Sequence, residues 1–180
     1  DASPALFLGG GWIAMGEANH AEATKSGDTG SIFRARLALA DYRLNAGQIE
    51  TAIADYLACL QTTKTSNDPK AWAVVAKKLG IAYMRFGELQ NCITRHNVDS
   101  CLLPLKGGAI HVDKRGSEQA AKVFQTLLDV DPGDLGSIWL LKRPDDLEKP
   151  CTPIKVDEAP TMHRMRVVNG QIACKTLHGK

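Results

Sequence analysis

The sequence predicts an all-α fold of paired helices that carries a cysteine-containing insertion and ends in a small β-hairpin. Apolar residues recur at helical spacing from residue 31 to residue 141, except over one irregular stretch. Gly47 and Gly87 interrupt this spacing at matching points of two helix pairs. Near the C-terminus, Asn169-Gly170 separates two short β-type segments and favours a type I′ turn. The expected parts are an N-terminal arm and short helix over residues 1–30, a helical domain over residues 31–142 with an insertion at 88–116, and an extended tail with the β-hairpin over residues 143–180.

The size and composition are those of an ordinary globular protein. The chain has 180 residues, of which 44% are hydrophobic and 23% are charged, so one domain can bury a substantial core. Its apolar runs are too short to cross a bilayer, so we expect no membrane insertion. The net charge is only +2, and no Lys/Arg cluster alternates with aromatic residues, which argues against nucleic acid as a partner.

The first 30 residues combine three consecutive glycines with a short apolar segment. Gly9-Gly10-Gly11 is either a hinge or a point of close backbone approach. The simpler interpretation is a loose arm followed by a short helix from about Trp12 to Thr24. The alternative is an arm that docks into a neighbouring subunit.

Two helices joined at Gly47 form the first predicted hairpin. Thr29 or Ser31 is the expected N-cap of the first helix, and Gly47 is its expected stop. The apolar positions are Phe33, Leu37, Ala40 and Leu44 in the first helix and Ile49, Ala52, Ile53, Tyr56, Leu57 and Leu60 in the second. Both sets follow the spacing of a helix that buries one face. The short turn makes the two helices antiparallel.

The second hairpin is split by the insertion. Asn67-Asp68-Pro69 predicts the start of its first helix, because an Asp or Asn side chain caps free amides and proline suits the first helical position. Gly87 is the predicted end of that helix, and Ser117 is the predicted cap of the second. The apolar faces are Trp72, Val75, Leu79, Ala82, Tyr83 and Phe86, then Ala120, Val123, Phe124, Leu127 and Val130. Asp134 is predicted to cap a last short helix.

These segments resemble tetratricopeptide repeats. The segment from Asn45 to Tyr56 is similar to the turn and second helix of such a repeat, and Leu79, Gly80, Tyr83 and Gly87 are similar to its first helix. The resemblance implies a solenoid of helical hairpins. In such a stack, small residues such as Gly80 and Ala52 let helices approach closely, while Tyr56, Tyr83 and Phe124 fill the space between layers. In the first repeat, Arg43 occupies the usual aromatic position.

The insertion carries a second resemblance. Between the repeat helices lie Asn91-Cys92, His96-Asn97, Ser100-Cys101, Leu103-Pro104 and Gly107-Gly108, followed by His111. This order is similar to the repeat region attached to secreted ASPIC/UnbV-type β-propeller proteins of bacteria, over roughly residues 71–141. It implies the repeat scaffold of a secreted protein. No propeller sequence is present in this chain.

The five cysteines are distributed unevenly. Cys59 lies on a helical stripe, whereas the other four lie in irregular regions rich in glycine and proline. This distribution favours two local disulfides, Cys92 to Cys101 and Cys151 to Cys174, with Cys59 as a buried thiol. We therefore expect a periplasmic or extracellular protein. The start Asp1-Ala2-Ser3-Pro4 would suit a mature N-terminus left after cleavage of a signal peptide.

A metal site remains the alternative to the disulfide in the insertion. Cys92, His96, Cys101 and His111 form the one cluster with metal-ligand chemistry. Zinc sites usually use more closely spaced cysteine pairs than Cys92 and Cys101. Two alternatives therefore remain. One is a disulfide-closed loop with solvent-facing histidines, and the other is a copper, zinc or haem-iron site that uses His96 and His111. No other cofactor is expected.

Repeats of this kind expose their first helices on a hollow face, which is the expected partner site. The candidate residues are Arg34, Asp41 and Asn45 from one repeat and Lys77, Lys78 and Arg85 from the next. Such a basic patch suits an acidic tail or a carboxylate. The alternative is a surface that is merely solvated.

The sequence offers no convincing catalytic residues. Neither Gly9-Gly10-Gly11 nor Gly107-Gly108 fits a nucleotide-binding motif, and no serine, histidine and acid set is evident. We therefore expect a non-enzymatic scaffold or assembly subunit of an extracytoplasmic complex or filament, which binds another protein or copies of itself. The N-terminal arm and the β-hairpin are candidates for pairing between copies. The alternative is a metal-binding or redox protein that uses the Cys/His insertion.

Overall fold

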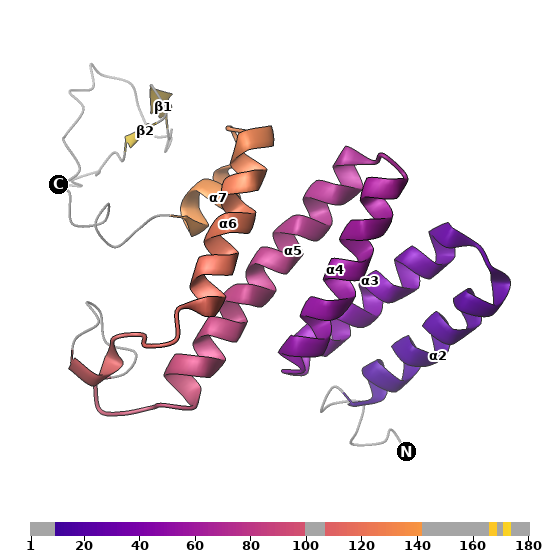
Figure 1. Cartoon of the computed structure of the whole chain (residues 1–180), viewed down its shortest axis with the longest axis horizontal. Coiled ribbons are helices and arrows are strands. Elements are labelled where there is room, and N and C mark those ends of the chain that lie inside the picture. Colours follow the sequence, from indigo (N-terminus) through magenta and orange to yellow (C-terminus); the bar gives the residue numbers. More distant parts are fainter. Residues whose placement is uncertain (1–9, 100–106, 142–165, 169–170, 174–180) are drawn as a thin grey trace, which may run out of the picture. The chain divides into compact units, whose positions relative to one another are not determined.

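The computed structural model describes residues 10–99, 107–141, 166–168 and 171–173. The chain divides into two compact units, Asp1–Leu141 and Lys142–Lys180. The first unit is helical throughout its regular structure, so the predicted all-α class is confirmed (Figure 1).

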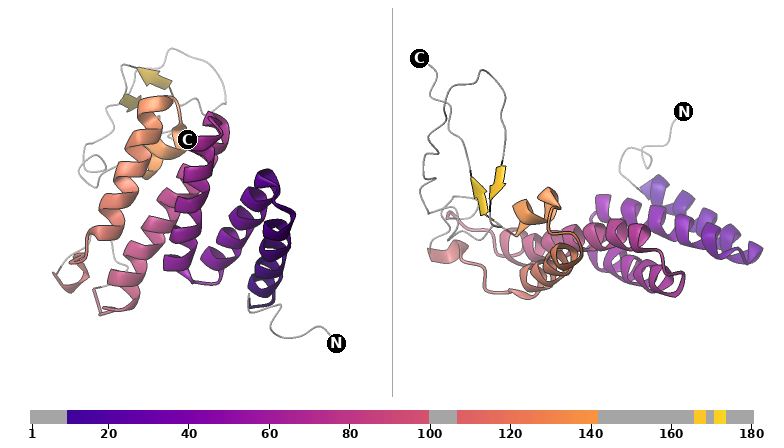
Figure 2. Two further views of the ribbon diagram at one scale, coloured as in Figure 1. Left: turned by 45° about the vertical axis from the view of Figure 1, so that its right-hand side comes forward. Right: turned by 90° about the horizontal axis from the view of Figure 1, so that it is seen from above.

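The helices of the first unit follow one another as antiparallel neighbours. They are α2 (Gly10–Ser26), α3 (Thr29–Asn45), α4 (Ile49–Thr65), α5 (Pro69–Glu88), α6 (Arg115–Val130) and α7 (Leu135–Leu140). One π-helical turn, Leu89–Ile93, continues α5, and one 3-10 turn, Gly107–Ala109, lies in the insertion. In Figure 2 the colours pass in order from indigo α2 to orange α6, because each helix packs against its neighbours in the sequence. None of the helices in the described part of the chain has the length and apolar character to span a membrane.

Aspartates precede three of the helices. Asp68 caps α5 by accepting a hydrogen bond from the Ala71 amide at 2.9 Å, with Pro69 at the first helical position, so this predicted start is confirmed. The predicted cap of α3 was wrong: the cap is Asp28, which accepts from the Ser31 amide at 2.8 Å. A carboxylate at this position satisfies a free amide and also suits the positive end of the helix dipole.

The two boundaries around the insertion also differ from the prediction. Gly87 does not end α5, which runs to Glu88 and continues into the π-helical turn. Ser117 does not cap α6, which already begins at Arg115; its hydroxyl instead donates to the Lys114 carbonyl. Gly87 is used for packing: a Cβ atom built at Gly116 would lie 2.4 Å from the Gly87 amide nitrogen. The backbones of α5 and α6 therefore touch where the helices cross.

The core consists of two clusters that share side chains. The first cluster centres on Ala40, Tyr56 and Leu79, and the second on Ala76 and Phe124. Tyr83 packs against both clusters, so the predicted aromatic contacts between neighbouring hairpins are present. Gly80 allows the close approach of helices that was predicted for it, because a Cβ atom there would lie 2.6 Å from Phe124 Cζ.

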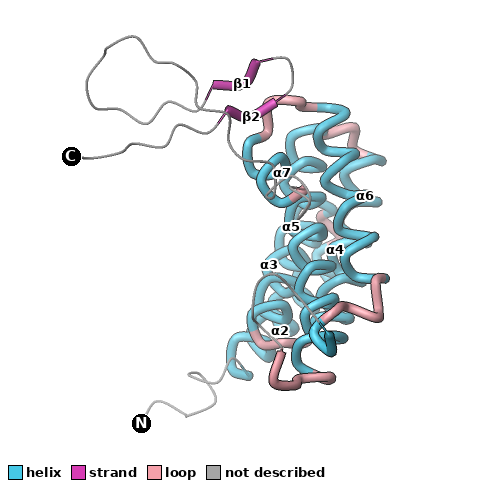
Figure 3. Tube along the Cα trace, turned by 90° about the vertical axis from the view of Figure 1, so that its left-hand side faces the viewer, coloured by secondary structure: helices cyan, strands magenta, loops and turns pink. Residues whose placement is uncertain are grey.

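From α3 to α7 the helices alternate between two layers. Figure 3 shows α3, α5 and α7 on one side, which we call layer one, and α4 and α6 on the other. Ion pairs join the members of layer one: Lys78 of α5 reaches Asp41 of α3, and Lys77 reaches Asp134 at the start of α7. Arg43 of α3 bonds to Glu17 of α2 and to Asp55 of α4, so this side chain joins α3 to both of its sequence neighbours. We call α4 and α6 layer two.

Two short strands are described in the second unit. β1 (Arg166–Val168) pairs antiparallel with β2 (Gln171–Ala173), with Val167 opposite Ile172. The turn residues Asn169 and Gly170 lie outside the described part of the chain, so the type I′ turn stays a prediction.

Candidate functional site

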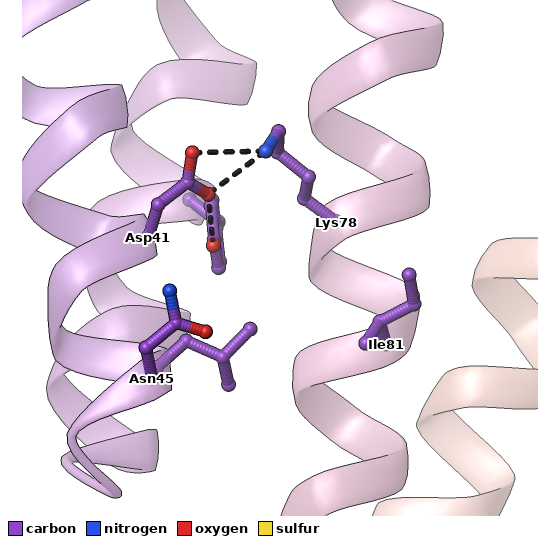
Figure 4. A pocket seen from close by; sticks show the side chains of 6 residues that line it. Asp41, Asn45, Lys78 and Ile81 are labelled. Carbon is purple, nitrogen blue, oxygen red and sulfur yellow. Dashed lines mark hydrogen bonds and ion pairs between the residues drawn. The ribbon is translucent and has the colours of Figure 1, made fainter.

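An open pocket of about 270 Å3 lies between α3, α4 and α5. Its lining residues are Asp41, Leu44 and Asn45 from α3, Tyr56 from α4, and Lys78 and Ile81 from α5. Figure 4 shows α3 and α5 facing each other across it, with Ile81 on one side and Asn45 on the other. The pocket is therefore built mainly by two neighbouring helices of layer one.

Asp41 organises the polar side of the pocket. Lys78 Nζ donates to both oxygens of the Asp41 carboxylate, each at 2.9 Å. The Tyr56 hydroxyl donates to Asp41 Oδ1 at 2.6 Å. Both members of the ion pair are about one-third exposed, at 35% each, so solvent screens their attraction. The pair fixes the geometry of the pocket and leaves its charge balanced.

Tyr56 holds the Asp41 carboxylate in place from the buried side of the pocket. Its side chain is fully buried. Burial, followed by the hydrogen bond to Asp41, raises the pKa of the Tyr56 hydroxyl well above its ordinary value. The hydroxyl therefore stays protonated and acts as a permanent donor to Asp41.

The six predicted partner-binding residues divide into two groups. Asp41, Asn45 and Lys78 line the pocket, whereas Arg34, Lys77 and Arg85 do not. The four predicted cations each have a carboxylate nearby: Arg34 with Asp28 at 3.9 Å, Lys77 with Asp134 at 2.8 Å, Lys78 with Asp41 at 2.9 Å and Arg85 with Glu88 at 3.0 Å. The predicted basic patch is thus paired with acids along its length.

Apolar side chains extend the pocket along α5. Ile81 is 38% exposed, and Val74, two helical turns earlier, is 53% exposed. Because residues seven apart lie on one face of a helix, Val74 and Ile81 form an apolar strip on the exposed face of α5. Sequence reasoning missed Ile81, although it lies one turn after Lys77, which was selected for the same face.

The insertion is closed at its base by one amide side chain. Asn91, which is buried, donates to the carbonyls of Gly87 and Asp113 at 2.9 and 2.7 Å and accepts from the Asp113 amide at 3.0 Å. These bonds join the end of α5 to the start of α6. Sequence reasoning did not identify Asn91 as this closure, because its partner Asp113 lies at the far end of the irregular stretch.

Asp113 is itself held by Arg115. The Arg115 guanidinium donates to both carboxylate oxygens, with the shortest contact at 2.6 Å. These hydrogen bonds lower the pKa of Asp113 to about 2. Arg115 also lies over the Phe86 ring, with 5.8 Å between Cζ and the ring centroid.

Two of the predicted Cys/His residues come together. Cys92 Sγ lies 3.3 Å from His111 Nε2, and His96 is exposed on the insertion. Cys101, Cys151 and Cys174 lie outside the described residues, so both predicted disulfides stay predictions. Across residues 10–99 and 107–141 and the two strands, no group of three or more His, Cys, Asp or Glu side chains is arranged to hold a metal ion.

Cys59 is a buried free thiol, as predicted. Burial raises its pKa to about 11, which keeps it protonated near neutral pH. It belongs to the core and not to a reactive site.

Comparison with known proteins does not identify the chain: no protein-family model, no curated protein and no solved structure matches it.

Proposed function

We propose that the chain is a non-enzymatic protein-binding scaffold whose helices form a tetratricopeptide-like solenoid. Its partner binds along layer one, at the pocket between α3 and α5. The observation that carries this proposal is the pocket itself, which two neighbouring helices of one layer form without any catalytic arrangement among its six lining residues. A pocket between repeated helices recurs along a stack and suits an extended partner.

The lining indicates what kind of segment binds there. Leu44 and Ile81 offer apolar contact, and the exposed Asn45 amide offers both a donor and an acceptor, which matches a peptide backbone. Because Lys78 is neutralised by Asp41, positive charge contributes little to the choice of partner. We propose an extended peptide that inserts an apolar side chain beside Ile81 and pairs its backbone with Asn45.

A random-peptide library panned against the immobilised full chain tests this proposal. Ile81→Glu places a charge in the apolar wall and is expected to weaken the selected peptides by about tenfold or more, since burying an unpaired charge is costly. Leu57→Glu is the matched control, because Leu57 is an exposed aliphatic residue on α4, at 46% against 38% for Ile81, and does not line the pocket. Selected peptides that bind both variants equally would refute the pocket as the binding site.

We further propose that this scaffold works outside the cytoplasm, with disulfides Cys92 to Cys101 and Cys151 to Cys174. Four cysteines in irregular segments support this assignment. Thiol titration of the unreduced protein is expected to find a single thiol, Cys59, and to find it only after unfolding, because the folded chain buries it. Five thiols without reductant would refute the disulfides.

The contact between Cys92 and His111 favours a second candidate, a metal-binding or redox protein. A thiolate and an imidazole at 3.3 Å are a suitable pair of ligands for copper or zinc. Elemental analysis of the purified protein separates the two candidates. Stoichiometric metal that is lost in His111→Ala would support the second, whereas absence of metal together with two disulfides would support the scaffold.

A further inference from the structure

The surface between α3 and α5 continues beyond the pocket. The two helices run in the same direction, because each is antiparallel to α4 (Figure 1). Asp41 of α3 faces Lys78 of α5, since the two side chains are hydrogen-bonded. One turn earlier on each helix, this register brings Ala38 opposite Val74. Leu37, which precedes Ala38, packs against the core instead.

Ala38 and Val74 leave room for the side chain of a ligand, and we call this pair the second subsite. Val74 is 53% exposed. Ala38 is half-buried and contributes only a methyl group to the opposite side. The second subsite is thus apolar, like the side of the pocket that Ile81 forms.

The two lysines between these apolar positions are both occupied by acids. Lys77 and Lys78 lie on the same face of α5 as Val74 and Ile81, because they are three and four residues from each. Lys77 binds Asp134 at the start of α7, and Lys78 binds Asp41 of α3. The two ammonium groups therefore point to opposite sides of α5, and the surface between the pocket and the second subsite has balanced charge.

The distance between Val74 and Ile81 selects the conformation of the ligand. Seven residues of an α-helix span about 10.5 Å. Side chains on one face of a β-strand recur at about 6.6 and 13 Å, so neither spacing fits. In a polyproline II helix every third residue returns to the same face after about 9.3 Å, which is close to the required distance.

An α-helical ligand would also match this spacing, through residues that are seven apart. Its backbone groups, however, are hydrogen-bonded within the helix and are not free to pair with the exposed amide of Asn45. A polyproline II helix has no internal hydrogen bonds, so its backbone can pair with Asn45.

From these observations we propose that the partner segment is a polyproline II helix with apolar side chains at positions i and i+3. One side chain lies beside Ile81, and the other enters the second subsite between Ala38 and Val74. The two residues between them cross the ion pair of Asp41 and Lys78. Because that pair is neutral as a whole, uncharged residues such as proline complement it. This inference rests on the proposed function, since it names the class of partner that the same site binds.

Synthetic proline-rich peptides that differ only in the spacing of two leucines test the inference. Fluorescence polarisation measures their binding to the full chain. The peptide with leucines at i and i+3 is expected to bind about tenfold or more tightly than a peptide with a single leucine, because it buries a second side chain. Peptides with leucines at i and i+2 or at i and i+4 are expected to bind like the single-leucine peptide.

Variants of the second subsite separate it from the pocket. Val74→Glu is expected to remove the advantage of the second leucine and to leave the binding of the single-leucine peptide unchanged. Ala38→Leu fills the second subsite without adding charge and is expected to have the same effect. Val130→Glu is the matched control, because Val130 is an exposed valine, at 65%, on α6 of layer two. Thermal melting checks that all three variants fold.

Two results would overturn the inference and leave the proposed function intact. One is equal binding of the three two-leucine spacings, with all of them weakened by Ile81→Glu. The other is an advantage of the i and i+3 peptide that persists in Val74→Glu. Peptides that bind equally to Ile81→Glu and the unaltered protein would refute the proposed pocket as well, and so would the absence of binding by every peptide.

Discussion

Arg43 shows how one side chain joins three helices. Its guanidinium donates to Asp55 at 2.6 Å and to Glu17 at 2.8 Å. Burial lowers the pKa of Arg43, but the hydrogen bonds to Glu17 and Asp55 outweigh it and raise the pKa overall. Arg43 therefore stays charged and ties α2 and α4 to α3.

Replacing Arg43 by Met is expected to lower the free energy of unfolding by roughly 1–3 kcal/mol, because Asp55 is largely buried and would lose its partner. Urea denaturation measures the change. Arg34→Met is the control, since its ion pair with Asp28 is mostly exposed and is expected to contribute almost nothing. Equal losses in the two variants would contradict this account.

The Asp113 carboxylate gives the protein an acid-sensitive contact. Its pKa is about 2 in the folded chain and 3.8 in an unperturbed aspartate, so the folded state favours the ionised form. The stability that this contact provides is present above pH 3.8 and is lost as the pH falls toward 2. NMR titration of the Asp113 carboxyl in Arg115→Gln is expected to show a pKa closer to 3.8.

Arg95→Gln is the control for this titration, because Arg95 acts on Asp113 only through a weaker long-range attraction. Its effect on the pKa of Asp113 is expected to be smaller than that of Arg115→Gln. An Asp113 that titrates near 3.8 in the unaltered protein would contradict the assignment.

At the scale of elements, the insertion is attached to the helices through Asn91 and Asp113. Asn91→Ala would leave the Asp113 amide and carbonyl without their partner, and we expect it to cost about 1–3 kcal/mol of unfolding free energy. Hydrogen exchange of the Asp113 amide is expected to accelerate even where the helices stay protected. Gln90→Ala, one residue earlier, serves as the control, and equal acceleration in both variants would argue against a specific closure.

Local signals predicted a helix boundary correctly where adjacent residues alone determine it. Asn67-Asp68-Pro69 predicted the start of α5 correctly because capping depends only on adjacent residues. Gly87 was misread as a stop because its real reason, the contact with Gly116, involves a residue beyond the insertion. Asp28 was missed as a cap because Thr29 and Ser31, which follow it closely, also have side-chain oxygens that cap helices.

The candidate site was predicted in part for the same reason. Helical spacing within α3 and α5 placed Asp41, Asn45 and Lys78 on one surface, and all three line the pocket. The acids that neutralise the expected basic patch could not be assigned from spacing alone, since Asp134 lies far along the chain from its partner Lys77. Charge on a helix face can be predicted from sequence, whereas its compensation depends on tertiary packing.

At the scale of the helical unit, packing between successive helices sets the order of stability. Since α4 and α5 are covered on both sides and α2 and α7 chiefly on one, amide hydrogen exchange is expected to be slowest in α4 and α5 and fastest in α2 and α7. Uniform protection across the six described helices would contradict this order.

The closure at Asn91 has a practical consequence for engineering. Because Asn91 and Asp113 bring the two ends of the irregular segment together, the entropic penalty of a longer loop between them grows only slowly with its length. The insertion between Asn91 and Asp113 is therefore a suitable place to add a sequence, such as an epitope or a fluorescent reporter, with α5 and α6 left in register on either side.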